Sequence, residues 1–141
     1  MTPILVFDIE TIPDVAGLRR VWDLPADATD EAVADFATQR RRQATGSDFL
    51  QCHLHRVVAI SCALRERDSV RVWSLVSSKD GEAELVKRFF DGIDKYTPQL
   101  VSWSGSGFDL PVLHDRALFH GTPAPKYWDL GEDDRDFKWN N

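Results

Sequence analysis

One stretch near the N-terminus constrains the fold of this chain most, because it joins an apolar run to two carboxylates. It reads Ile4-Leu5-Val6-Phe7-Asp8-Ile9-Glu10-Thr11. Four consecutive apolar residues at the start of a domain predict a β-strand that is buried on both faces. Side chains alternate along a strand, so Asp8 and Glu10 are expected to point to the same face.

Two interpretations of this acid pair are open. Like charges on one face of a buried strand repel each other, and no Lys or Arg precedes Arg19 to pair with them. A divalent metal ion bound between Asp8 and Glu10 would remove the repulsion. Alternatively, the strand ends at Asp8 and both carboxylates are hydrated. The rest of the chain has to decide between a metal site and an ordinary strand end.

The composition is that of one globular domain. The 141 residues are 43% hydrophobic and 28% charged, which suits a single domain, residues 1–141, with its own core. No apolar run is long enough to span a bilayer, and no basic segment of a signal peptide precedes the first strand. No membrane contact is therefore expected. Cys52 and Cys62 form no metal or redox motif, which favours a cytoplasmic location.

The charge limits how the chain can bind nucleic acid. A net charge of −6 argues against binding by charge alone. It does not argue against an enzyme whose metal ions neutralise both its own carboxylates and a substrate phosphate.

The first half of the chain predicts an insertion followed by a hairpin. Residues 14–50 read as a helical insertion, in which the second helix begins at the N-cap Thr29. Strands are expected at 56–64, buried on both faces, and at 70–76. The polar turn between them is short, so the two strands form an antiparallel hairpin.

The second half predicts two helices around a parallel strand. The first helix opens at Ser78 or Asp80, and its apolar positions follow helical spacing: Leu85, Val86, Phe89, Phe90 and Ile93. A strand at 100–103 arrives by a helical crossover and should lie parallel to its neighbour. The last helix is expected to bury Val112, Leu113, Ala117 and Leu118. The expected fold is α/β, a mixed sheet with packed helices.

Asp109 stands just after the strand at 100–103. If this strand and the first are parallel neighbours, Asp8, Glu10 and Asp109 converge at one edge of the sheet. Two roles fit Asp109: a metal ligand, or the N-cap of the helix that it opens. Three carboxylates without His or Cys favour Mg²⁺ or Mn²⁺. Two such ions about 4 Å apart can hold an attacking water and the leaving 3′ oxygen of a phosphodiester.

Two segments resemble a known superfamily. Val6-Phe7-Asp8-Ile9-Glu10-Thr11 resembles the first motif of the DEDD superfamily of 3′–5′ exonucleases. Ser104-Gly105-Ser106-Gly107-Phe108-Asp109-Leu110-Pro111 resembles the second motif, in the group related to the exonuclease domain of family B DNA polymerases. The resemblance spans essentially the whole chain. It implies a ribonuclease H-like fold and two ions, Mg²⁺ or Mn²⁺, bound by Asp8, Glu10 and Asp109. The implied partner is the 3′ end of single-stranded DNA or RNA.

The resemblance also implies substrate contacts for four residues. Thr11 and Ile12 would lie beside the 3′-terminal nucleotide. Phe108 would pack on a base or sugar, unless it belongs to the core. Ser104 stands where the motif usually has asparagine, and its hydroxyl can donate a hydrogen bond over a shorter reach.

The third motif of the superfamily, a tyrosine or histidine followed by a fourth carboxylate, has no convincing counterpart after Asp109. The acids between residues 129 and 136 lack a strand-to-helix setting. The chain is therefore expected to stop before this motif, with an incomplete metal site. The main hypothesis is a metal-dependent 3′–5′ exonuclease with a two-metal mechanism. The alternative is a catalytically incomplete nuclease-fold module that binds nucleic acid or a protein partner. A ribonuclease H-like endonuclease fits the G-F-D-L-P context less well.

Overall fold

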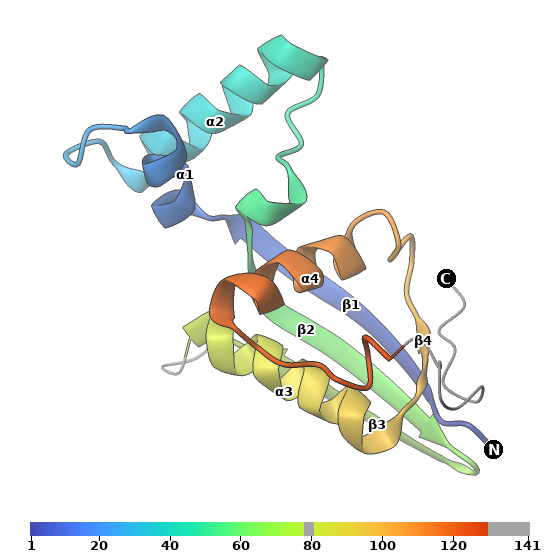
Figure 1. Cartoon of the computed structure of the whole chain (residues 1–141). Helices are drawn as coiled ribbons and strands as arrows, with labels where there is room; N and C mark the ends of the chain where they lie inside the picture. The colour runs from blue at the N-terminus through green and yellow to red at the C-terminus, as the bar shows by residue number, and fades with distance from the viewer. Residues whose placement is uncertain (78–80, 130–141) are drawn as a thin grey trace. The chain divides into compact units, whose positions relative to one another are not determined.

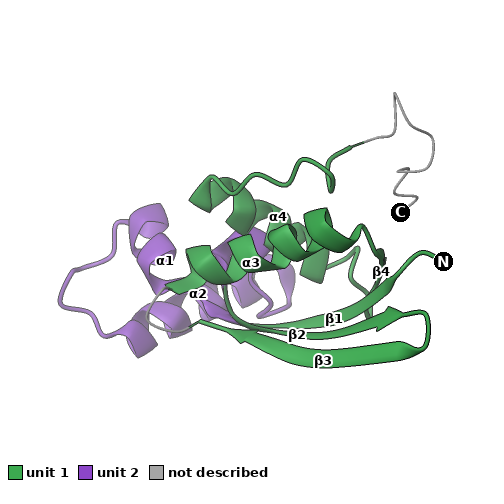
Figure 2. Cartoon of the chain, turned by 90° about the horizontal axis from the view of Figure 1, so that it is seen from below, with its two compact units in different colours: residues 1–10, 57–141 green, residues 11–56 purple. Residues whose placement is uncertain are grey.

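The computed structural model describes residues 1–77 and 81–129, which form two compact units (Figures 1 and 2). The sheet unit comprises residues 1–10 and the described residues from 57 onward. The inserted unit comprises residues 11–56. None of the described helices is long and apolar enough to cross a membrane.

The sheet has four strands in the order β3-β2-β1-β4. These are β1 (Ile4–Pro13), β2 (His55–Glu66), β3 (Ser69–Val76) and β4 (Gln99–Val101). β2 and β3 form the predicted antiparallel hairpin, and Ala63 pairs with Val72. β1 and β4 are parallel, with Val6 opposite Val101, as the helical crossover predicted. The mixed sheet with its helices is an α/β arrangement consistent with the ribonuclease H-like fold.

Helices α3 (Gly81–Tyr96) and α4 (Asp109–His120) lie on the same face of the sheet (Figure 2). The apolar positions predicted for α3 are all buried, and Phe89 contacts Phe7 of β1 with ring centroids 5.1 Å apart. The candidate caps Ser78 and Asp80 lie outside the described residues.

The prediction for α4 is wrong at one position. Val112, Leu113 and Ala117 are buried as expected, but Leu118 is exposed. The buried stripe of α4 also contains Asp109 and Arg116, at helical spacing from the apolar residues. Leu118 lies off this stripe, because each residue turns by about 100° around the helix axis.

The opposite face of the sheet is bare among the described residues. On β1, Leu5, Phe7 and Ile9 are buried, whereas Val6, Asp8 and Glu10 are exposed. The same alternation leaves exposed valines on the neighbouring strands: Val70, Val72, Val76 and Val101. On β2, Ser61 is exposed between the buried Ile60 and Cys62, and Arg65 is exposed after the buried Leu64. The prediction that both strands are buried on both faces is therefore wrong, because an apolar run does not reveal how many layers cover it.

A buried carboxylate ties both helices to the sheet. Glu82, in the first turn of α3, accepts a hydrogen bond from the backbone N–H of Val57 on β2 at 2.5 Å. The same carboxylate accepts two from Arg116 of α4, at 2.5 and 2.8 Å, and lies 2.7 Å from Nε2 of His120. Both side chains of the Glu82–Arg116 ion pair are only 4% exposed. This contact fixes the helix at whose start Asp109 lies.

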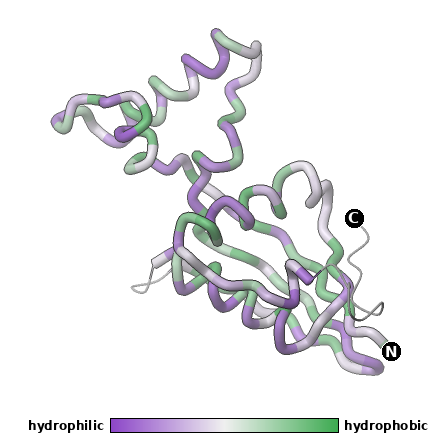
Figure 3. Tube along the Cα trace, viewed as in Figure 1, coloured by the Kyte–Doolittle hydropathy of each residue, from purple (hydrophilic) through white to green (hydrophobic). Residues whose placement is uncertain are grey.

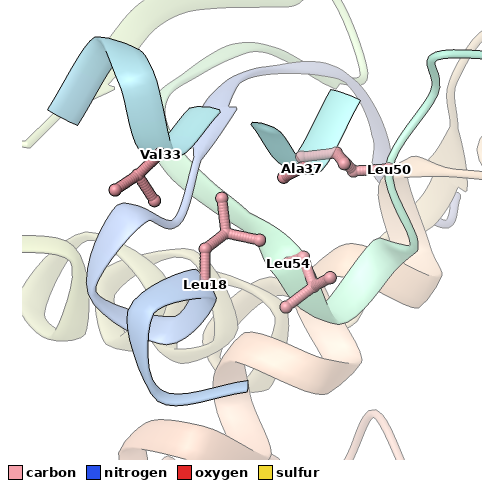
Figure 4. Close-up of a cluster of buried hydrophobic side chains, with 5 residues drawn as sticks. All are labelled: Leu18, Val33, Ala37, Leu50 and Leu54. Atoms are coloured by element: carbon pink, nitrogen blue, oxygen red, sulfur yellow. The ribbon is translucent and has the colours of Figure 1, made fainter. Parts of the chain in front are cut away.

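The inserted unit has its own core. It contains α1 (Val15–Trp22), α2 (Asp30–Thr45) and a 3-10 helix (Cys52–Leu54). Five side chains form a buried cluster (Figure 4): Leu18, Val33, Ala37, Leu50 and Leu54. Thr29 caps α2 as predicted, since its Oγ1 accepts a hydrogen bond from the N–H of Ala32 at 3.1 Å. Hydrophilic and hydrophobic colours alternate along α2 (Figure 3), in keeping with its narrow buried face.

Replacing Arg116 with methionine is expected to destabilise the chain by about 3–5 kcal/mol, because it leaves the Glu82 carboxylate buried without its cation. The measurement is the free energy of unfolding in urea. Lys87→Met is the matched control, since it breaks an exposed ion pair between Lys87 and Asp91, which both belong to α3. That loss should be small beside the effect of Arg116→Met, because solvent screens an exposed ion pair. Equal effects of the two substitutions would contradict the role given to Glu82.

Candidate functional site

Asp8 and Glu10 lie on the bare face of β1. Both are exposed, and they share this face as the strand period predicted. β1 continues to Pro13, so the interpretation in which the strand ends at Asp8 is wrong. The two carboxylates project from a continuous strand and not from a loose end.

A tight loop leads from β4 to Asp109. Within it, Ser104 has a left-handed backbone with φ of 57°, a conformation in which asparagine is enriched. A Cβ on Gly105 would lie 1.7 Å from Oγ of Ser102, so a larger residue there would require the Ser102 side chain to move. The carbonyl of Gly105 then accepts a hydrogen bond from the N–H of Leu110 at 2.8 Å, in the first turn of α4. The loop is thus anchored directly to the helix that carries Asp109.

Asp109 is buried and does not cap the helix. Phe108 occupies the N-cap position without a side-chain hydrogen bond, and Asp109 is the first residue of α4. The capping interpretation of Asp109 is therefore wrong. Its side chain is 4% exposed, and its Oδ2 has no hydrogen-bond partner among the described residues. A buried oxygen without a partner is costly, and such atoms in native proteins often face an ion or a ligand.

The negative charge of Asp8 acts on the carboxyl of Asp109. Burial raises the pKa of the Asp109 carboxyl above its usual value, and the negative charge of Asp8 raises it further. The charge of the exposed Asp8 thus acts on the buried Asp109, whereas the convergence of all three carboxylates stays a prediction. A buried carboxylate oxygen without a partner, next to a second carboxylate, fits a hard divalent cation such as Mg²⁺ or Mn²⁺.

The third carboxylate does not complete a site in this structure. Within residues 1–77 and 81–129, no group of three or more His, Cys, Asp or Glu side chains is arranged to hold a metal ion. Glu10 shares the face of Asp8 without joining such a group. The three-ligand site of Asp8, Glu10 and Asp109 stays a prediction. The acids at 132–136, considered for the fourth carboxylate, lie outside the described residues.

The predicted substrate contacts fall in both units. Ser104 is exposed and Phe108 is half-buried, both in the loop before α4. Thr11 and Ile12 belong to the inserted unit, where Ile12 is exposed. Oγ1 of Thr11 lies 3.0 Å from Nδ1 of His55, a contact between residues far apart in sequence that the sequence pattern did not predict.

The protonation of His55 follows from its second contact. Its Nε2 lies 3.2 Å from the carbonyl of Leu50, which can only accept a hydrogen bond. Nε2 therefore donates, and Nδ1 accepts from the hydroxyl of Thr11. Burial lowers the pKa of His55, which favours this neutral form.

Asp8 and Glu10 lie on an open surface. A cavity of about 20 Å³ lies between α3 and the sheet, next to Cys62 and Phe89. A wider depression of about 670 Å³ involves Lys87 and His120. Neither is lined by Asp8, Glu10 or Asp109. An exposed position on a sheet face suits an extended polymer better than a small molecule, which usually binds in an enclosed pocket.

A family profile matches residues 47–141, and its family is described as a predicted 3′–5′ exonuclease related to the exonuclease domain of PolB. The chain belongs to this exonuclease-related family. The matched residues include Asp109 and its loop, whereas Asp8 and Glu10 precede them. No curated protein and no solved structure matches the chain. Family membership therefore supports a nuclease-like domain and leaves the chemistry to be argued from the residues.

Asp109→Asn is expected to stabilise the chain at pH 7. Because the folded-state pKa of Asp109 is raised, its ionised form costs stability above that pKa. The cost fades as the pH falls through the raised pKa toward 3.8, the usual value, below which folded and unfolded chains are both protonated. The gain from the substitution should fade in the same window. Urea unfolding at pH 7 and near pH 3.5 measures it.

Asp115→Asn, on the same helix, is the control for this substitution. It should show no such loss of effect between the two pH values. If Asp109→Asn lowered the free energy of unfolding at pH 7, it would contradict the interpretation of Asp109 as an unpaired carboxylate that is repelled by Asp8.

Proposed function

We propose that this chain is a metal-dependent 3′–5′ exonuclease that hydrolyses phosphodiester bonds at the 3′ ends of single-stranded DNA or RNA. One observation carries the proposal: the buried Asp109 has an oxygen without a partner among the described residues, and the charge of Asp8, exposed on the sheet face, acts on this carboxyl. Membership of the exonuclease-related family supports the reaction class. The acidic surface supports a metal-dependent route, because carboxylates alone would repel a phosphate.

Each candidate residue has a proposed role in this reaction. Asp8 and Asp109 would hold the first cation, and Glu10 extends the acidic face along β1 toward a second. Two hard divalent ions would supply an activated water and neutralise the leaving 3′ oxygen. Ser104 and Phe108, in the loop before α4, would contact the sugar or base. Thr11 and Ile12 follow Glu10 along the strand and remain candidate contacts to the terminal nucleotide.

The activity test uses a single-stranded oligonucleotide with a 5′ label, a free 3′ hydroxyl and Mn²⁺. Stepwise shortening from the 3′ end is expected. Asp8→Ala and Asp109→Asn should each reduce the rate at least about 100-fold, since even outer partners of metal ligands cost 10- to 100-fold. Asp115→Asn should retain the rate. Shortening that survives Asp8→Ala would overturn the mechanism.

A second candidate is a nuclease-fold module that binds without cleaving. The lack of a three-ligand group among the described residues favours it. Tight binding of the same oligonucleotide without shortening would identify this module. Cleavage of a circular single strand would identify an endonuclease, because a circle offers no 3′ end.

Metal binding can be tested without any substrate. Mn²⁺ at about 100 times its dissociation constant should raise the free energy of unfolding by about 2.7 kcal/mol. The effect should be lost in Asp109→Asn and kept in Asp115→Asn. Stabilisation by Mn²⁺ that persists in Asp109→Asn would remove Asp109 from the proposed ligands.

A further inference from the structure

Trp103 is the most exposed large apolar side chain of the described residues. Its exposed fraction is 92%. Tryptophan is largely buried in most folded proteins, so nearly full exposure of an indole needs an explanation. Within residues 1–77 and 81–129, Trp103 makes none of the ring contacts that hold other tryptophans, such as that of Trp22 with Phe36.

Trp103 lies in the segment that leads from β4 to Asp109. It follows Val101 by two residues, and the strand partner of Val101 is Val6, which precedes Asp8 by two residues. Trp103 also opens the tight loop that ends at Asp109. The N–H of Gly107 bonds to the carbonyl of Ser104, and Leu110 bonds back to Gly105, so this loop has a defined shape. Trp103 therefore lies at the start of a loop of defined shape that leads to Asp109.

The charge of the chain makes an uncharged contact necessary. Proteins usually gain affinity for nucleic acid from basic residues that neutralise phosphates. This chain has a net charge of −6, and two carboxylates stand at the site itself. Stacking on an aromatic side chain supplies affinity independently of charge and of base identity. An exposed indole is the best surface for such stacking.

We propose that Trp103 is a stacking platform for one nucleobase of a single strand, next to the carboxylates that act on its backbone. The proposal rests on the function proposed above, and it adds the residue that supplies binding free energy without charge.

The test measures binding of a 5′-fluorescein oligothymidylate by fluorescence anisotropy, with Ca²⁺ in place of Mn²⁺ to slow hydrolysis. Trp103→Ala should raise the dissociation constant by roughly 5- to 150-fold, the range for one lost stack. Trp103→Phe should recover most of the affinity, because it restores an aromatic face, and Trp103→Leu should not. Trp128→Ala is the matched control: Trp128 is also exposed, but its ring makes a tilted contact with His114 and an edge-on contact with Tyr127, and its loss should leave binding unchanged.

Abasic oligonucleotides separate stacking from a structural role. An oligonucleotide that lacks the stacked base should bind the unmodified chain as weakly as the full oligonucleotide binds Trp103→Ala. The same base removal should cost Trp103→Ala nothing further. A purely structural role would lower the affinity for every oligonucleotide equally, and that result would overturn the proposal.

The remaining outcomes distinguish this proposal from the proposed function. If Trp103→Ala binds and shortens the oligonucleotide as the unmodified chain does, stacking is overturned and the exonuclease function stands. If the unmodified chain binds no single strand at all, both proposals fall together.

Discussion

The contact between Glu82 and Arg116 is the interaction on which the sheet unit depends. One carboxylate binds the backbone of β2, the guanidinium of Arg116 and the imidazole of His120, while it belongs to α3 itself. Apolar packing between α3 and the sheet is non-directional and leaves α4 free to slide. The buried ion pair between Glu82 and Arg116 does not allow α4 to slide, because any shift would leave a buried charge without its partner. The start of α4, and Asp109 with it, is therefore held in one register.

This rigidity matters because the arrangement of carboxylates at the site lowers the stability of the folded chain. Asp8 and Asp109 repel each other, and the buried oxygen of Asp109 lacks a hydrogen bond among the described residues. Left to itself, such a pair would turn apart into solvent. The helix held by Glu82 and Arg116, together with the hydrogen bond from Leu110 to Gly105, opposes this on the side of Asp109. Stability supplied elsewhere in the fold thus maintains an arrangement that only a cation would satisfy, which is a common feature of functional sites.

Local patterns in the sequence predicted those features that have local causes. The strand period placed Asp8 and Glu10 on one face, and the helical crossover predicted that β4 is parallel to its neighbour, which is β1. Features with non-local causes were missed. Nothing near Glu82 in the sequence indicates that its partner is Arg116, and the apolar run of β1 gave no sign that helices cover only one of its faces. Asp109 had the residue type of an N-cap, but the loop geometry made Phe108 the cap.

The inserted unit closes its own ends. Thr11 contacts His55, and the N–H of Asp14 donates to the carbonyl of Leu54 at 2.9 Å. These contacts, together with the separate core around Leu18, have a consequence for the order of folding. If the segment between β1 and β2 were unfolded, their pairing would carry the entropic cost of closing a flexible loop. This cost grows by about 0.6 kcal/mol for each doubling of the loop length. If the inserted unit folds first, it brings the ends of β1 and β2 close together. The two strands can then pair as fast as strands that are close in sequence.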